Sequence, residues 1–317
     1  MYLSADLEWA IGLHRFILKM SGLWPDYDET SQDKLGSNIR IFVICITTSL
    51  LLLIPMYLSL LRVFNDIWSL IDNLQLTLPV TFLVYKLCIM WWNKDALASI
   101  VRMITNDWLR IKTECQRKIM IKQARRARIL MIFSVIITMS TVLTLAIPPC
   151  FGLTMRYATN ITDPGRLLIF QTHYTYDIEK SPAYEITFIG QIVVFMMEAF
   201  PYVGIDNFMG LCIFHVCAQL ETLAEDLTNL GQLKEFGVNL RSCVKNHIRL
   251  IRFSYVLWCV DLLENTFSIM LLGLLFYCSI LLSCNRFPHY PWKYANALFV
   301  TKLSSENLFH CINVLFR

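Results

Sequence analysis

Three titratable side chains stand out in the apolar stretch between residues 186 and 220, namely Glu198, Asp206 and His215. Such a group is a candidate for proton transfer, metal binding or ligand recognition, because ionisation is costly in apolar surroundings. Asp206 and His215 are nine residues apart, which places them on nearly opposite faces of a helix. They are therefore not expected to form one site, and Asp206 is expected to be a polar anchor at the membrane surface.

The common sequence motifs of enzymes are absent from this chain. It contains no H-E-x-x-H, G-x-S-x-G or G-x-x-x-x-G-K-[ST] pattern, and no C-x-x-C pair. We therefore predict no enzyme, no metal and no cofactor. Glu198 keeps one alternative open, a multi-pass transporter or membrane enzyme that uses this carboxylate. The structural interpretation is a protonated Glu198 that is hydrogen-bonded to Asn73, Gln75 or Thr138.

The composition is that of a membrane protein. Hydrophobic residues make up 56% of the 317 residues and charged residues only 16%, with a mean hydropathy of +0.51. Soluble domains have about 25% charged residues. The net charge of +4 is too small to indicate a nucleic-acid partner. We predict an all-α, multi-pass helical protein in the lipid bilayer.

Five apolar segments are predicted to cross the bilayer, whose hydrocarbon core is about 30 Å thick. They comprise residues 41–61, 67–92, 129–155, 186–206 and 253–284. The fourth segment is expected to continue as a helix to residue 223, and a short amphipathic helix at the membrane surface is expected before the first. Lys86 in the second is expected to extend its ammonium group to the interface. Residues 1–283 then form one transmembrane domain, and 284–317 form a divergent tail.

The distribution of basic residues sets the orientation. Ten of the 28 Lys and Arg residues lie between residues 93 and 128, whereas the 156–185 loop has three. The positive-inside rule therefore places the N-terminus and the 93–128 segment in the cytoplasm. The 156–185 loop is then outside, where Asn160 begins the sequon Asn-Ile-Thr and is predicted to be glycosylated.

The outer halves of spans two to four predict a small-molecule pocket. Their side chains are apolar or aromatic with one amide to orient a ligand, as is typical of such sites. Ordinary helix packing is the alternative interpretation of the same spacing. The predicted ligand-binding residues are Leu74, Leu78, Leu143, Ala146, Ile147, Phe151, Phe188, Gln191, Ile192 and Phe195.

Beyond Asp206 the helix is apolar around its whole circumference although it has left the lipid. Such a helix must be buried in protein, either against this chain's own cytoplasmic helices or in a subunit interface. The residues predicted to make this anchor or subunit contact are Phe208, Leu211, Phe214, His215 and Gln219.

Several phrases, in order and spacing, resemble the insect odorant receptor family. The resemblance covers roughly residues 7–283. The phrases are Gly22-Leu-Trp-Pro25, Ser181-Pro-Ala-Tyr-Glu185, Gly204-Ile-Asp-Asn-Phe208, His215-Val-Cys-Ala-Gln-Leu-Glu-Thr-Leu223, His247–Leu250 and Leu263-Glu-Asn-Thr-Phe-Ser268.

This resemblance implies an odorant receptor subunit in the plasma membrane of olfactory sensory neurons. Such receptors bind volatile odorants in an outer-leaflet pocket and form ligand-gated cation channels as hetero-tetramers with a co-receptor. The family has seven spans with a cytoplasmic N-terminus, and the seventh lines the pore. Nothing after Ser283 matches it, so the chain is expected to be truncated and to lack the pore helix. A gustatory receptor of the same fold class and a non-functional remnant are the other possibilities.

Overall fold

The computed structural model describes residues 2–25, 31–65, 67–110, 112–151, 168–229 and 236–259. Every regular element within these ranges is a helix, which confirms the predicted all-α class. The predicted sequon at Asn160, most of the fifth predicted span and the 284–317 tail lie outside them. The elements are α1 (Tyr2–Met20), α2 (Ser31–Thr48), the π-helical η1 (Ser49–Leu53), α3 (Ile54–Arg62), α4 (Ile67–Trp92), α5 (Lys94–Leu109), α6 (Glu114–Cys150), α7 (Ala183–Asn229) and α8 (Phe236–Cys259).

Three helical segments in the described residues are long and apolar enough to cross a membrane. They are Gln32–Arg62, Glu114–Cys150 and Ala183–Asn229, and they contain the first, third and fourth predicted spans almost entirely. The second predicted span ends at Trp92, where α4 and α5 meet at a bend of 73°. Helix α5 therefore leaves at an angle instead of continuing the span.

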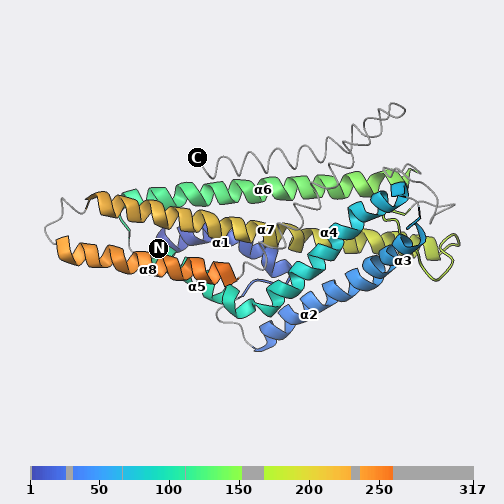
Figure 1. The fold of residues 1–317 in the computed structure, drawn as a ribbon, viewed down its shortest axis with the longest axis horizontal. Helices are drawn as coiled ribbons and strands as arrows, with labels where there is room; N and C mark the ends of the chain where they lie inside the picture. Colours follow the sequence, from blue (N-terminus) through green and yellow to red (C-terminus); the bar gives the residue numbers. More distant parts are fainter. Residues whose placement is uncertain are drawn as a thin grey trace, which may run out of the picture.

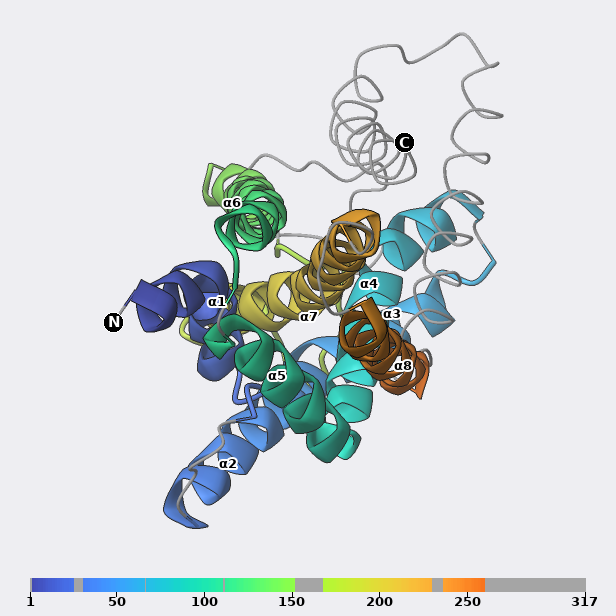
Figure 2. The ribbon, with the colours of Figure 1, turned by 90° about the vertical axis from the view of Figure 1, so that its left-hand side faces the viewer.

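Two long antiparallel helices form the axis of the molecule. With 47 and 37 residues, α7 and α6 are about 70 Å and 55 Å long at 1.5 Å per residue. Both therefore extend well beyond a ~30 Å hydrocarbon core. Figure 1 shows them side by side along the longest dimension, while α2, α3 and α4 reach only one end. In the end-on view of Figure 2, α7 is surrounded by α1, α5, α6 and α8.

The N-terminal helix α1 belongs to the core and is not only a membrane-surface helix as expected. Ala10, Ile17 and Leu18 are buried, while Phe16 stays exposed. A glycine makes its close approach to α7 possible, because a Cβ at Gly204 would lie 3.1 Å from the Leu18 side chain. This close approach occurs within one of the phrases that resemble the odorant receptors.

A second glycine ends α1. Gly22 has a φ of +74°, and hydrogen bonds from Gly22 N to Lys19 O and from Leu23 N to Leu18 O form a Schellman motif. A Cβ at Gly22 would also lie 2.5 Å from the Ser37 carbonyl oxygen of α2. The turn that leads from α1 to the first span therefore requires glycine.

The largest apolar cluster lies in the half of the molecule that contains α1 and α5. The sequence predicts this half to be cytoplasmic, and we call it the cytoplasmic half. It joins α1, α2, α4, α5, α6 and α7 and includes Trp24, Leu87, Trp108, Phe208 and Leu211. A smaller cluster, centred on Phe170 and Val194, lies near the outer ends of α7 and the first span. Among the described residues, fewer buried side chains therefore hold the outer half together than the cytoplasmic half.

Candidate ligand-binding region

Gln191 is the polar centre of the outer part of α7. Its side chain is 1% exposed and carries the amide predicted to orient a ligand. Its Nε2 donates to Thr172 Oγ1 at 3.0 Å and to Tyr174 Oη at 3.1 Å, and its Oε1 accepts from the Phe170 backbone N–H at 3.3 Å. Both amide protons are therefore used within the chain.

The partners of Gln191 all come from residues 168–174, which we call the buried loop segment. It was expected to be part of a polar outer loop, but Leu168, Ile169 and Phe170 are at most 3% exposed. The backbone N–H of His173 donates to the Pro55 carbonyl at 2.9 Å. Tyr174 Oη donates to the Leu51 carbonyl at 2.8 Å. The buried loop segment thus links α7 to the first span.

An apolar and aromatic cluster surrounds this polar centre. Phe170 is fully buried and meets Phe195 edge to face, with ring centroids 5.1 Å apart. Such pairs add about 0.5–1.5 kcal/mol beyond the area that they bury. The cluster consists of Leu52, Met56, Ile169, Phe170 and Val194 with Leu76, Leu145, Ala146, Phe188, Ile192 and Phe195 around them.

Half of the ten predicted ligand-binding residues meet in this region. Gln191 lies at its polar centre, and Ala146, Phe188, Ile192 and Phe195 contribute to the cluster. The half-buried Leu74 is outside it. Four others present exposed side chains on the outside of the bundle, with relative exposures of 38% for Leu78, 56% for Leu143, 49% for Ile147 and 76% for Phe151.

Glu198 lies about two turns beyond Gln191 along α7. Its side chain is 3% exposed, and its Oε1 makes no hydrogen bond within the described residues. Thr48 of α2 lies beside it, but its hydroxyl also lacks a hydrogen bond there. The predicted partner Asn73 instead donates to Ser59 Oγ at 2.8 Å. Glu198 is therefore a buried carboxyl group whose Oε1 acceptor is unused within the described residues.

Lys86 and Asp206 form an ion pair between α4 and α7. Lys86 Nζ lies 2.6 Å from Asp206 Oδ1, and the two side chains are 1% and 25% exposed. The ammonium group of Lys86 extends to this carboxylate, and its predicted extension to the membrane interface stays a prediction. Asp206 is likewise a pairing partner and not only a surface anchor.

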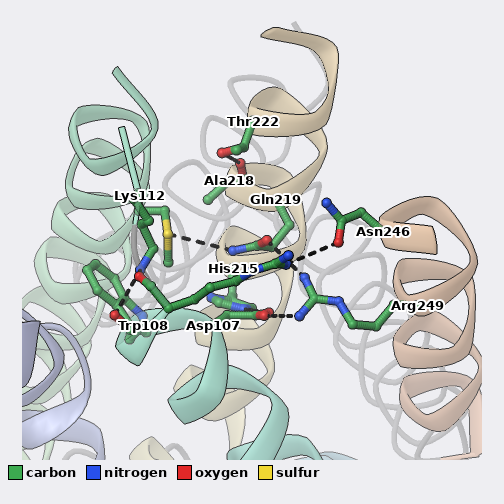
Figure 3. Close-up of polar contacts among 11 residues, drawn as sticks. Asp107, Trp108, Lys112, His215, Ala218, Gln219, Thr222, Asn246 and Arg249 are labelled. Carbon is green, nitrogen blue, oxygen red and sulfur yellow. Dashed lines mark hydrogen bonds and ion pairs between the residues drawn. The ribbon is translucent and has the colours of Figure 1, made fainter. Parts of the chain in front are cut away.

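A further group of ion pairs connects the helices α5, α7 and α8. His215 Nε2 of α7 lies 3.1 Å from Asp107 Oδ2 of α5, and Arg249 of α8 pairs with Asp107 Oδ1 (Figure 3). Burial alone would raise the pKa of Asp107, but hydrogen bonds and charge from His215 and Arg249 hold it below the ordinary value of 3.8. His215 is thus paired with Asp107 and not with Asp206.

The residues predicted to make anchor contacts lie within this chain's own helices. Phe208 and Leu211 are buried in the cytoplasmic core, and Phe208 meets Trp24 edge to face at 6.3 Å. Phe214 and Gln219 are half-buried. Gln219 Oε1 accepts from Arg249 at 3.5 Å. The structure therefore shows these residues in contact with the chain's own helices, and a subunit contact stays a prediction.

Sequence reasoning missed Asp107, although the sequence contains a signal for it. Leu97, Ile100, Val101 and Ile104 form the apolar face of α5, and Asp107 follows Ile104 by three residues on the same face. An acid on a buried helical face requires a partner. Its partners are 108 and 142 residues away along the chain, so the sequence alone cannot name them.

A metal site is not indicated in the part of the chain that the structure describes. There, no group of three or more His, Cys, Asp or Glu side chains is placed to hold an ion. The outer region contains an apolar and aromatic cluster around one amide whose hydrogen bonds are internal.

The long, antiparallel apolar helices define a multi-pass helical membrane protein. The family model for the 7tm Odorant receptor matches residues 66–288. The chain belongs to this odorant receptor family, as its sequence phrases predicted. No curated protein shows significant similarity to it.

Solved structures of an insect olfactory receptor share the fold. The olfactory receptor OR5 from Machilis hrabei is 13% identical, with a TM-score of 0.74 over 96% of this chain and 78% of that chain. The same receptor in complex with eugenol is 15% identical, with a TM-score of 0.75 and the same coverage. At this identity the similarity extends to the fold.

Proposed function

We propose that this chain is an odorant receptor subunit that binds volatile small molecules between the outer half of α7 and the buried loop segment. Binding would gate a cation channel that the chain forms with a co-receptor in the plasma membrane of olfactory sensory neurons. Membership of the odorant receptor family supports this proposal. So does the complex of a receptor of similar fold with eugenol, an aromatic volatile.

The observation that carries the proposal is the hydrogen-bonded Gln191 inside an aromatic cluster. Its amide is 1% exposed and holds Thr172 and Tyr174, while Phe170 and Phe195 lie beside it. A volatile with one oxygen and a hydrocarbon body matches this combination. Its oxygen can replace the Thr172 or Tyr174 hydroxyl as the acceptor of a hydrogen bond from the Gln191 amide. Displacement of the buried loop segment would accompany binding.

The proposal can be tested by measuring how a panel of volatiles, including eugenol, binds to the full chain in lipid nanodiscs. We expect saturable binding that Phe195→Ala weakens about tenfold, since truncation removes the aromatic contact. Leu143→Ala is the matched control, because its side chain is 56% exposed outside the cluster. Equal losses in both variants, or linear uptake without saturation, would contradict the proposed site.

Channel gating needs a separate assay. Co-expression with the co-receptor in cultured cells, followed by calcium imaging during odorant application, should show responses that Phe195→Ala shifts to higher odorant concentration. The prediction that this chain lacks the pore-lining helix of the family concerns residues outside the described ones. Loss of the response with unchanged odorant binding would leave the binding site intact and refute the gating step.

A further inference from the structure

A polar cavity lies in the cytoplasmic part of the molecule, far from the outer region. It has a volume of about 210 Å³ and is bounded by α5, α6, α7 and α8. Its position along α7 spans Gln219 to Asp226, which is about 20–30 Å beyond Asp206 at 1.5 Å per residue. The cavity therefore faces the cytosol and not the lipid headgroups.

Basic side chains outnumber acidic ones in the walls of this cavity. Arg110, Lys112 and Arg249 line it together with the two acids Asp107 and Asp226. Both carboxylate oxygens of Asp107 are already engaged, one by Arg249 and one by His215. The positive charge of Arg249 is therefore neutralised by Asp107 inside the wall.

Two cations remain whose hydrogen bonds within the described residues go to neutral oxygens. Lys112 Nζ donates to the carbonyls of Trp108 at 2.8 Å and Arg110 at 3.0 Å, as Figure 3 shows in part. Arg110 donates to Asn246 Oδ1 at 3.1 Å. Burial lowers the pKa of Lys112, and the nearby charges of Asp107 and Asp6 only partly offset this effect. An anion placed between the two would supply the missing charge.

The remaining walls provide further hydrogen-bonding groups. Ser242, Thr222 and Gln116 surround the cavity, and Asp226 already accepts from Gln116 Nε2 at 2.8 Å. The volume corresponds to roughly seven waters at the ~30 Å³ that each occupies in the liquid. This is below the ~300–1,000 Å³ of pockets for drug-sized ligands. The size and the surplus positive charge both point to a small anion with several oxygens.

We infer that this cytoplasmic cavity binds a small, soluble, phosphate-containing anion, held by Arg110 and Lys112. Such an anion would connect the α5–α6 junction, which carries both cations, with α8 through the contact of Arg110 with Asn246. Occupancy would therefore stiffen the packing of the cytoplasmic helices. The inference does not depend on odorant binding or on a partner subunit.

Equilibrium binding of ³²P-labelled pyrophosphate to the full chain in phosphatidylcholine nanodiscs tests the inference. We expect saturable binding that the double variant Arg110→Gln/Lys112→Gln weakens at least tenfold. The matched control is Lys118→Gln/Arg125→Gln, which removes the same charge from exposed positions of α6 outside the cavity. The affinity of this control variant for pyrophosphate should stay within twofold of that of the unmodified protein.

A steric variant separates cavity binding from loss of fold. Ser242→Phe changes no charge and projects a ring into the cavity from an exposed position on α8, so it should also weaken binding at least tenfold. Unfolding temperature and monodispersity are measured for each variant. Three results would overturn the inference. They are cavity variants that bind pyrophosphate as tightly as the unmodified protein, a control variant that loses as much affinity as the cavity variants, and binding that does not saturate up to about 10 mM pyrophosphate.

A last arm distinguishes the source of the phosphate. Nanodiscs that contain phosphatidylinositol bisphosphate should leave pyrophosphate binding unchanged, because the cavity lies too deep in the cytosol for a headgroup to reach. Competition by this lipid would refute a soluble ligand.

Discussion

The ion pair between Lys86 and Asp206 gives the sharpest prediction about stability. The substitution Lys86→Met keeps an unbranched apolar side chain but removes the ammonium, which leaves the Asp206 carboxylate 25% exposed and without its 2.6 Å ion-pair partner. Loss of one partner of a buried pair costs about 3–5 kcal/mol. Because a quarter of the Asp206 side chain reaches solvent, we expect the lower end of that range, about 3 kcal/mol.

The size of the expected change can be measured by thermal unfolding in nanodiscs. At about 2 °C for each kcal/mol, the unfolding temperature of Lys86→Met should fall by about 6 °C. The double variant Lys86→Met/Asp206→Leu should recover much of this loss, because an apolar pair replaces the unpaired charge. Lys180→Met, which removes an exposed pair with Asp177, is the control and should change little.

The double-mutant cycle can refute this reasoning. If Lys86→Met and Asp206→Leu lower stability additively within about 0.5 kcal/mol, the two side chains are not energetically coupled. The ion pair would then have no part in holding α4 against α7.

Two further predictions concern the cytoplasmic half. Gly22→Ala should destabilise the fold by about 1–2 kcal/mol in thermal or denaturant unfolding, because φ is +74° there, whereas Gly36→Ala meets no atom within 4 Å and should be neutral or slightly stabilising. Equal effects of the two would contradict the Schellman turn. The folded-state pKa of Asp107 lies below its ordinary 3.8, so its ion pairs stabilise the fold above that pH and are lost as the pH falls further. In the Asp107→Asn variant, the unfolding temperature should therefore fall less steeply with decreasing pH below about pH 4 than in the unmodified protein. An equally steep fall in both proteins would contradict this prediction.

The helical architecture could be predicted because it depends on the apolar composition of long segments. Apolar segments longer than a bilayer require helices, and the all-round apolar stretch after Asp206 required burial in protein. The structure buries Phe208 and Leu211 in the cytoplasmic core accordingly. The family phrases led to the same class of protein, and the family match confirms it.

The faces of the outer helices could not be predicted. In a membrane helix that is apolar all round, periodicity does not separate the side that faces lipid from the side that faces protein. Val142 is 3% exposed and Leu143 56% exposed, although both are aliphatic. The ligand-binding role of the predicted residues therefore depends on which of them face the cluster around Phe170.

Pairings between distant residues were equally hidden. The Lys86–Asp206 contact spans 120 residues, and only the fold brings the two together. The buried loop segment was concealed by its own composition, because Gln171, Thr172 and His173 read as loop residues beside the apolar Leu168–Phe170. Gln191 donates hydrogen bonds to the hydroxyls of Thr172 and Tyr174, whereas the buried amide of Gln171 makes none within the described residues.

The most direct test of the proposed odorant site is photoaffinity labelling. The full chain in nanodiscs is labelled with a diazirine derivative of an aromatic volatile that binds saturably, with and without excess unlabelled ligand, and the modified peptides are identified by mass spectrometry. We predict that competable labelling falls on Phe170 and on residues 188–195 of α7. Competable labelling confined to the exposed faces around Leu143 and Ile147, or to the cytoplasmic cavity, would contradict the proposed site.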